Sequence, residues 1–352
     1  MRGYKARQNL AVICNEQGRF DEAEGHFRQV IAERRDFLPG WVGLGELLLA
    51  RKRWPELEEA LAGLAAAPNG SPEAVLLRAR AHLARGEFGA ARDVLETAIA
   101  AAPSALPPRV LLSHAWLQEG IDFGAAEKAL SAVLELVPDH AEARNNLAVL
   151  RQQRERTRAT ADAVFSGNVG VAELYCSACR CDHPLHEYLP TLVVLARSCQ
   201  HITDVGTGIG LAATAFLYGA PERLVCIDRV RYPEVDRLGL VAGRTDFTFR
   251  ATDILWEDLE ETDLLFLDTW HVAEQLSEEL RLHAGKVRKF IVIHGTTAFA
   301  DQGEDPGYHG FGPVIEKFLA QGTFRLKERR TSGAGLTILE RVDQPAASPE
   351  AP

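Results

Sequence analysis

The chain has 352 residues, enough for two domains that each bury a core of their own. Hydrophobic residues make up 46% and charged residues 25%, as in globular proteins, and the net charge of −10 argues against a nucleic-acid backbone as the main partner. No apolar run reaches the roughly 18 residues of a membrane span, the N-terminus carries no stretch of signal-peptide length, and the cysteines are too few for a disulfide framework. We therefore expect a cytoplasmic protein without a membrane span.

A 34-residue period runs through the first part of the chain. Phe20, Trp54 and Phe88 are each 34 residues apart, and Phe123 follows 35 residues later. Glycine precedes most of these aromatic residues and a small residue follows them, which is the pattern of tetratricopeptide repeats. Each such repeat is a pair of antiparallel helices, and small residues let neighbouring helices approach closely. The second repeat departs from the pattern because Lys52 stands in the glycine position.

The period also predicts the domain organisation. We expect residues 1–155 to form about four repeats and a capping helix, 156–172 a helical linker, 173–342 an α/β domain and 343–352 a disordered tail. The repeat surface has two interpretations. It is either a concave binding surface for a protein or peptide, or a spacer or dimerisation arm that holds the second domain.

Short apolar runs alternate with helical stretches from Ile202 onward, and this alternation predicts a parallel sheet. The expected strands are 202–205, 224–228, 247–251, 264–268 and 290–294, followed by a hairpin of 324–329 and 336–341. Ligands of such sheets bind at the carboxyl ends of the strands. Polar residues stand at or just after the first five of these ends: Asp204, Asp228, Asp253, Asp268 and His294.

The segment 201–216 predicts a strand, a glycine turn and the start of a helix. Gly206, Gly208 and Gly210 alternate behind Asp204, and the missing Cβ atoms let backbone N–H groups approach a ligand closely. Asp228 ends the second strand, where an acid can accept two hydrogen bonds from a ribose diol. Together these residues predict an adenosine-bearing cofactor; the alternative is a turn that only packs the helix on the sheet.

The Asp-x-Gly-x-Gly-x-Gly pattern resembles the first motif of class I S-adenosylmethionine-dependent methyltransferases, whereas the dinucleotide fingerprint would place its third glycine at Leu211. The chain from residue 173 to 341 is further similar to a bacterial group of methyltransferase-like domains related to the cephalosporin-hydroxylase-like family. That similarity rests on HEYLPTLVVLARSCQHITDVG, TDLLFLDTWHVAEQLSEELRLHAGKVRKFIVIH and LKERRTSGAGLTILER.

The resemblance implies an α + α/β protein, with a tetratricopeptide solenoid followed by a Rossmann-like seven-stranded methyltransferase domain. It implies S-adenosylmethionine as the cofactor, held by Asp204, Gly206, Thr207, Gly208, Gly210, Asp228 and Asp253. For Asp253, contact with the adenine amine and a role as helix N-cap are equal alternatives.

The residues that the resemblance assigns to the reaction lie after the fourth and fifth expected strands. The group's Asp-Thr-Trp-His is matched from Asp268 to His271, but its usual His-Asp-Thr-Thr is His294-Gly295-Thr296-Thr297 here. Mg²⁺ at these strand ends would polarise a substrate hydroxyl with Asp268 as one ligand, yet Gly295 provides no second carboxylate. A metal-free route would use His271 or His294 as general base, so Asp268, His271 and His294 are the catalytic candidates.

Two further segments have open interpretations. The loop 300–313, rich in glycine and acids, is either a lid with Tyr308 and His309 facing the substrate or a plain connection. The cysteines at 176, 179 and 181, with two nearby histidines, have a zinc-like composition, but no second ligand pair follows and we expect Cys179 to be a core residue.

The leading functional hypothesis is an S-adenosylmethionine-dependent methyltransferase acting on an oxygen of a sugar, polysaccharide-type or other small polar substrate, with a repeat arm that recruits a protein partner. One alternative is a scaffold that keeps the cofactor fold without activity, which the missing acid at Gly295 favours. Another is a hydroxylase-like enzyme of the cephalosporin-hydroxylase-related family.

Overall fold

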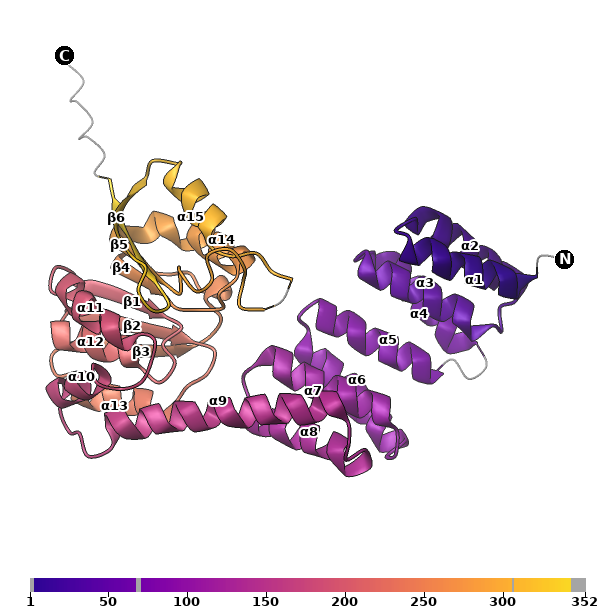
Figure 1. Ribbon diagram of the computed structural model, residues 1–352, viewed down its shortest axis with the longest axis horizontal. Coiled ribbons are helices and arrows are strands. Elements are labelled where there is room, and N and C mark those ends of the chain that lie inside the picture. The colour runs from indigo at the N-terminus through magenta and orange to yellow at the C-terminus, as the bar shows by residue number, and fades with distance from the viewer. Residues whose placement is uncertain (1–2, 68–70, 306, 343–352) are drawn as a thin grey trace, which may run out of the picture. The chain divides into compact units, whose positions relative to one another are not determined.

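A computed structural model describes residues 3–67, 71–305 and 307–342 (Figure 1). The chain divides into two compact units, Met1–Gln153 and Arg154–Pro352, and each is described by itself. The tail predicted at 343–352 lies outside the described residues. Across the described ranges, each helix is too short or too polar to span a bilayer.

The first unit is a series of antiparallel helix pairs, as the 34-residue period predicts (Figure 1). The aromatic residue of each repeat is the first residue of that repeat's second helix. A longer helix, α9 (Ala141–Phe165), then runs through the predicted boundary at residue 155 into the predicted linker. The paired helices are α1 (Tyr4–Glu16), α2 (Phe20–Glu33), α3 (Leu38–Ala50), α4 (Trp54–Ala66), α5 (Ser71–Ala84), α6 (Phe88–Ala101), α7 (Leu106–Glu119) and α8 (Phe123–Leu136).

The repeated apolar positions form the core of this unit. The helix α3 lies so close to α2 that a Cβ on Gly43 would be 2.3 Å from the Phe27 ring. Such close approach is what small residues at regular spacing permit. The core columns are no more than 2% exposed: Ala23, Ala91 and Ala126 in one, and Phe27, Leu61, Leu95 and Leu130 in the other.

The first helices of three successive repeats line a groove of about 430 Å³. Apolar side chains such as Leu77 from α5 and Val110 from α7 form part of its wall. Glu46 of α3 and Arg80 of α5 also line it, and they form an ion pair with Nη2 of Arg80 2.7 Å from the carboxylate. The groove therefore offers both an apolar and a charged surface.

The second unit contains one seven-stranded sheet in the order β3-β2-β1-β4-β5-β7-β6. The first five strands are parallel, and β7 is antiparallel to both of its neighbours. This order confirms the Rossmann-like seven-stranded sheet predicted from the sequence. The strands are β1 (His201–Val205), β2 (Arg223–Asp228), β3 (Asp246–Ala251), β4 (Thr262–Leu267), β5 (Val287–His294), β6 (Phe324–Arg330) and β7 (Leu336–Arg341).

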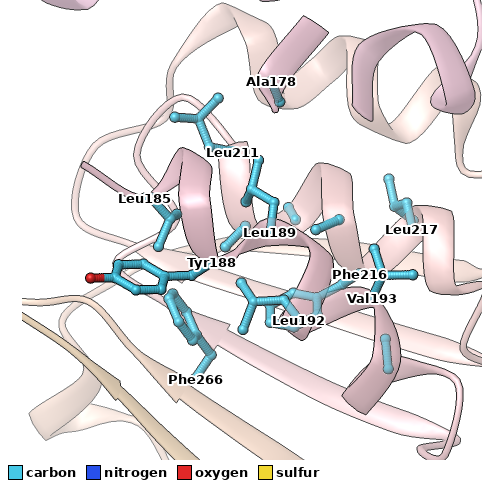
Figure 2. Packing of buried hydrophobic residues seen from close by; sticks show 14 of the residues in the cluster. Ala178, Leu185, Tyr188, Leu189, Leu192, Val193, Leu211, Phe216, Leu217 and Phe266 are labelled. Carbon is cyan, nitrogen blue, oxygen red and sulfur yellow. The ribbon is translucent and has the colours of Figure 1, made fainter. Parts of the chain in front are cut away.

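Helices cover both faces of the sheet. One face packs against α10 (Val171–Ala178), α11 (Leu189–Ala196), α12 (Leu211–Gly219) and α13 (Pro233–Val241). The other packs against α14 (Ala273–His283) and α15 (Gly312–Leu319). The single-turn helices η1 (His186–Tyr188), η2 (Ile254–Trp256) and η3 (Ala284–Lys286) complete the unit. Figure 2 shows Tyr188, Leu192 and Phe216 packed with Phe266 of β4 in the core of the first face.

The fully buried Tyr188 anchors the turn between β6 and β7. Its hydroxyl donates to the carbonyl oxygen of Ser332 and accepts from the N–H of Gly335 at 2.8 Å. The carbonyl of Gly335 in turn accepts from the N–H of Gly295 at 2.9 Å. The loop after β5 is thereby tied through the β6–β7 turn to the hydrophobic core.

Each of the four turns that precede α2, α4, α6 and α8 contains a residue with a left-handed backbone conformation. Gly18, Gly86 and Gly120 have φ values of 74°, 73° and 67°, and Lys52 has a φ of 54° at the same place in the second repeat. A left-handed backbone is free of strain for glycine but costs a residue with a Cβ about 1–2 kcal/mol. Lys52 therefore differs from the repeat pattern in its side chain, whereas its backbone conformation is the left-handed one of the glycines.

Lys52→Gly is expected to raise the free energy of unfolding of the repeat unit by about 0.5–1 kcal/mol, because it removes the left-handed strain at a small entropic cost. Chemical denaturation followed by helical circular dichroism measures this. Gly86→Ala is the matched reverse variant, since its Cβ would meet no atom within 4 Å. It should lower stability by about 1 kcal/mol; equal stability of Lys52→Gly and the parent chain would refute the prediction.

Candidate functional site

The site lies where the chain changes direction across the sheet, between β1 and β4. From β1 the strands run outward to β3, and from β4 they run outward in the opposite direction, so the loops after β1 and β4 leave the sheet on opposite sides. Such a switch point opens a crevice at the carboxyl ends of the strands. The predicted glycine turn follows β1 there, and Asp268 follows β4.

Each glycine of the turn has a positive φ, but their surroundings differ. A Cβ on Gly206 would be 1.9 Å from the carbonyl oxygen of Asp268, and one on Gly210 would be 2.3 Å from Leu238 Cδ1. A Cβ on Gly208 would meet nothing within 4 Å. Gly206 and Gly210 therefore permit packing of the protein on itself, and Gly208 is the glycine that borders open space.

Asp228 joins the end of β2 to this turn. One carboxylate oxygen accepts from the N–H of Gly208 at 2.8 Å, and the other accepts from the N–H of Val230 at 2.9 Å. Burial raises the pKa of Asp228, and these backbone N–H groups oppose that effect. The acid predicted to bind a ribose is thus next to the open glycine, as the βαβ argument requires.

Asp204 lies beneath the turn and is completely buried. Its Oδ2 accepts from the Cys226 thiol at 3.6 Å, whereas its Oδ1 has no hydrogen-bond partner. Burial raises the pKa of Asp204 to about 7. Asp204 is in register with Cys226 and Phe266 of the neighbouring strands, whose side chains lie on the face of the sheet covered by α10, α11, α12 and α13. Its predicted contact with a cofactor remains a prediction.

The remaining two cofactor candidates have partners within the protein. Thr207 is buried, and its hydroxyl donates to the backbone carbonyl of Asp204 at 3.2 Å. Asp253 accepts from the N–H of Leu255 at 3.0 Å as the N-cap of η2. The N-cap interpretation of Asp253 is therefore present in the structure, and its contact with an adenine stays a prediction.

The three catalytic candidates converge at the ends of β4 and β5. Nε2 of His271 lies 3.2 Å and Nδ1 of His294 lies 2.8 Å from the same oxygen, Oδ1 of Asp268. The side chain of Asp268 is 17% exposed and that of His294 is 6% exposed. Burial would raise the pKa of Asp268, but the two imidazoles lower it far below its usual range.

The neighbours of His271 hold its ring in place. Its Nδ1 lies 3.0 Å from Oε2 of Glu304, and the ring stacks on Phe299 with centroids 4.5 Å apart. Burial alone would lower the pKa of His271, but the hydrogen bonds with Asp268 and Glu304 raise it to about 9. The hydrogen bond with His271 in turn lowers the pKa of Glu304.

Gly295 is the position where the related group has an acid. It has a φ of 79°, and a Cβ there would be 2.4 Å from Cδ2 and 2.8 Å from Nε2 of His271. The His271 ring therefore fills the space that a side chain at 295 would enter.

The predicted substrate residues lie on the loop after β5. Tyr308 is 41% exposed, and its ring meets the edge of Trp270 with centroids 4.8 Å apart. His309 is more exposed, with its Nδ1 3.4 Å from Glu274 of α14. The loop is fastened near the cluster by Glu304 and by Asp305, which accepts from Trp270 Nε1 at 2.8 Å. A substrate role for Tyr308 and His309 stays a prediction.

The cysteine segment contributes a histidine that the sequence analysis did not assign to the site. His183 lies near enough to Asp268 and His294 for their charges to act on its pKa, which burial lowers. Cys181 is buried and donates to a backbone carbonyl at 3.0 Å, whereas Cys176 is exposed. Within the described ranges, the one group of side chains placed to hold a metal is Asp268, His271 and His294.

Glu304 is the other site residue that the sequence analysis missed. In the sequence it is one acid among several in the loop, but its contact with a histidine 33 residues earlier gives it a specific role. Thr269 is a further case, since its hydroxyl donates at 2.7 Å to the buried Glu279 of α14. Only the acid-rich composition of the loop pointed to Glu304, and nothing in the sequence pointed to Glu279.

Comparisons with known proteins found a family model and solved structures that are similar to parts of this chain. Residues 15–81 match the family model described as tetratricopeptide repeat. No curated protein matches the chain. Similar solved structures include both repeat proteins and methyltransferases.

Three of these structures illustrate the range. A thermophilic tetratricopeptide repeat protein from Thermus thermophilus is 19% identical over 51% of this chain and 89% of its own, with a TM-score of 0.36. The N-methyltransferase NodS from Bradyrhizobium japonicum, in complex with S-adenosyl-L-homocysteine, is 16% identical over 53% and 99%, with a TM-score of 0.37. The ribosomal protein L11 methylase from Lactobacillus delbrueckii subsp. bulgaricus is 18% identical over 44% and 79%, with a TM-score of 0.33. Likenesses with TM-scores this low carry no argument about this chain.

The fold class predicted from the sequence is thus confirmed in both parts. The chain joins a tetratricopeptide-type series of helix pairs to an α/β unit with a seven-stranded Rossmann-like sheet.

Gly206→Ala is expected to destabilise the α/β unit by about 3 kcal/mol, because the new Cβ would overlap the Asp268 carbonyl. Gly208→Ala is the matched control and should cost only about 1 kcal/mol, from its left-handed φ. Thermal unfolding of the two variants measures the difference. Equal destabilisation would contradict the close packing of β1 against the end of β4.

The raised pKa of Asp204 predicts a pH-dependent stability. Because the folded pKa lies above the unfolded value, the contribution of Asp204 is favourable below about pH 4 and is lost as the pH rises through about 7. Asp204→Asn should therefore gain about 1–3 kcal/mol relative to the parent chain between pH 4 and pH 8. Urea denaturation at both pH values tests this, and a stability difference independent of pH would count against a buried, protonated Asp204.

Proposed function

We propose that the α/β unit is an S-adenosylmethionine-dependent methyltransferase. The observation that carries the proposal is the pairing of the open glycine at 208 with Asp228, at the switch point of a seven-stranded sheet. An adenosine lying across this turn would bring its ribose to Asp228. The Asp268 cluster lies at the adjoining strand end, where a substrate would meet the cofactor's reactive group.

The residues that would hold the cofactor are those around the turn. Asp228 would exchange its bonds to backbone N–H groups for the ribose hydroxyls, and the backbone at Gly208 would then face the ligand. Bound S-adenosylmethionine supplies a methyl group on a sulfonium, which is ready for displacement. The protein's part is to align an acceptor with it and to exclude water.

We propose that the acceptor is a hydroxyl of a small polar or glycan-type substrate. In the transfer, the acceptor oxygen bonds to the methyl carbon, the carbon–sulfur bond breaks with its electron pair staying on sulfur, and the hydroxyl proton leaves. In the Asp268, His271 and His294 cluster, the carboxylate would orient the hydroxyl and an imidazole would receive this proton. Trp270 and Tyr308 expose aromatic surface beside it, which suits the apolar face of a sugar ring.

The repeat unit supports a second part of the proposal, a protein or peptide partner. The groove on α3, α5 and α7 combines apolar walls with the Glu46 and Arg80 charges. A peptide needs both features, since apolar contacts supply affinity and charges supply register. We propose that the repeat unit recruits a protein partner, and that this partner brings the substrate that the α/β unit methylates.

Binding of S-adenosylmethionine and S-adenosylhomocysteine to the full chain, measured by calorimetry, tests the proposed cofactor directly. Micromolar binding of both ligands, followed by transfer of a labelled methyl group to glycan or small polar acceptors, would support the proposal. Binding without transfer to any acceptor would favour the scaffold alternative. Binding of neither ligand would remove the methyltransferase proposal.

Asp228→Ala is expected to weaken S-adenosylhomocysteine binding at least tenfold, because the ribose loses its acceptor. Glu222→Ala is the matched control, an exposed acid just before the opposite end of β2, and should bind normally. Thermal unfolding of both variants checks that the turn is intact. Unchanged affinity in folded Asp228→Ala would show that the ligand does not reach the end of β2.

A further inference from the structure

The side chains at the ends of β4 and β5 bring together three atoms that could each bind a metal ion. One oxygen of Asp268 faces nitrogens from two different imidazoles, and the three ligand atoms lie within 4.8 Å of one another. His271 approaches from the loop after β4, and His294 ends β5. Three donors from two strand ends thus converge on one small volume next to the glycine turn.

The hydrogen bonds around the cluster indicate what belongs in that volume. Nδ1 of His271 faces the Glu304 carboxylate, which can only accept, so Nδ1 carries a proton. A neutral His271 then presents the lone pair of Nε2 to an oxygen lone pair of Asp268 at 3.2 Å. Two lone pairs at this distance repel each other unless a cation lies between them. Either a second proton or a metal ion supplies that charge.

The surroundings of His271 match those of a metal ligand. Metal-bound histidines usually donate their second ring nitrogen to a carboxylate, which fixes the tautomer and strengthens the ligand. Glu304 occupies this position, and the stacking on Phe299 holds the plane of the ring. Nε2 of His294, the nitrogen turned away from Asp268, is buried without a partner, so the atom of His294 aimed at the cluster is Nδ1.

We infer that Asp268, His271 and His294 form a three-ligand site for a first-row transition metal. Two imidazole nitrogens and one carboxylate oxygen suit Zn²⁺, Fe²⁺ or Mn²⁺. Mg²⁺, the metal considered from the sequence, prefers oxygen ligands, and the position that would supply a second carboxylate is Gly295. The donor set therefore does not fit a magnesium site.

The substitution at Gly295 and the position of His271 belong together. The imidazole lies where a side chain at 295 would be, with Cδ2 of the ring 2.4 Å from the position of a Cβ. An acid and this imidazole cannot occupy that space at once. Glycine at 295 thus leaves the ring of His271 in this position, with its Nε2 3.2 Å from Oδ1 of Asp268.

Three protein ligands leave positions open on a tetrahedral or octahedral ion, as in catalytic metal sites. A substrate hydroxyl bound there would be polarised and lose its proton more readily. This site is deduced from the side chains of Asp268, His271 and His294 alone. It does not depend on the proposed methyl transfer, and metal binding can be tested whether or not S-adenosylmethionine binds.

Metal binding to the full chain, without a histidine tag and after treatment with a chelator, is the decisive measurement. Calorimetry with Zn²⁺ and Mn²⁺, together with elemental analysis after dialysis, should show one equivalent of Zn²⁺ bound at micromolar or lower concentration. Mg²⁺ should compete only at millimolar concentration. Failure of Zn²⁺ to bind would overturn the inference and leave the cluster as a site that holds a proton.

Variants distinguish this site from other ligands on the chain. His271→Ala and His294→Ala should each abolish the tight binding of one equivalent of Zn²⁺. Glu304→Gln should weaken Zn²⁺ binding by about 10-fold to 100-fold, since it removes only the carboxylate that orients His271. His309→Ala, an exposed histidine paired with Glu274, is the matched control and should bind normally. Equal affinity in His271→Ala and the parent chain would overturn the site.

The absorption spectrum of the parent chain with bound Co²⁺ tests the ligand assignment without any variant, so a folding defect cannot affect it. Co²⁺ on nitrogen and oxygen ligands gives visible d–d bands without the strong near-ultraviolet band of a thiolate ligand. A thiolate band that disappears in Cys176→Ser would instead place the metal on the cysteine segment and refute the assignment. Circular dichroism of every variant confirms that the chain is folded.

Discussion

The contact of Gly206 with the carbonyl of Asp268 is the constraint on which the candidate site depends. A single methyl group at residue 206 would lie 1.9 Å from that oxygen, so the turn after β1 and the end of β4 can meet only because the residue is glycine. Beside this contact, the N–H of Asp268 donates to the carbonyl of Val205 at 2.9 Å. The proposed cofactor turn and the proposed catalytic acid are therefore one packed unit.

The polar cluster is held from several parts of the chain at once. Tyr188 ties the β6–β7 turn to the core, that turn bonds to Gly295, and Gly295 leaves room for the ring of His271. The loop after β5 returns Glu304 to the same ring. Because each connection joins residues far apart in sequence, a displacement of Tyr188 would be transmitted to the cluster through these backbone hydrogen bonds.

The sheet could be predicted from the sequence because its apolar runs and glycine turns are local signals, and all seven expected strands were found with ends shifted by no more than three residues. The repeats could be predicted because aromatic and small residues recur at a spacing of 34 or 35 residues. The partners of the site residues could not. Glu304 contacts the cluster only through tertiary packing, and His183 lies near enough for the charges of Asp268 and His294 to act on its pKa. From composition alone, Glu304 was a loop acid and His183 part of a zinc-like segment.

From the sequence, Gly295 is the loss of a catalytic carboxylate, which favours an inactive scaffold. The structure gives that glycine a different physical meaning, because the space beside it is filled by an imidazole that another carboxylate orients. An abandoned site would be expected to lose its buried charges, since unpaired buried ions are costly. Here Asp268 is paired with both histidines and Glu304 with one of them, at distances of 2.8–3.2 Å. Each of these two carboxylates thus keeps an imidazole partner that offsets the cost of burying it, and Nε2 of His294 is the ring nitrogen left unpaired. The absence of an acid at 295 has therefore not removed the pairing around Asp268.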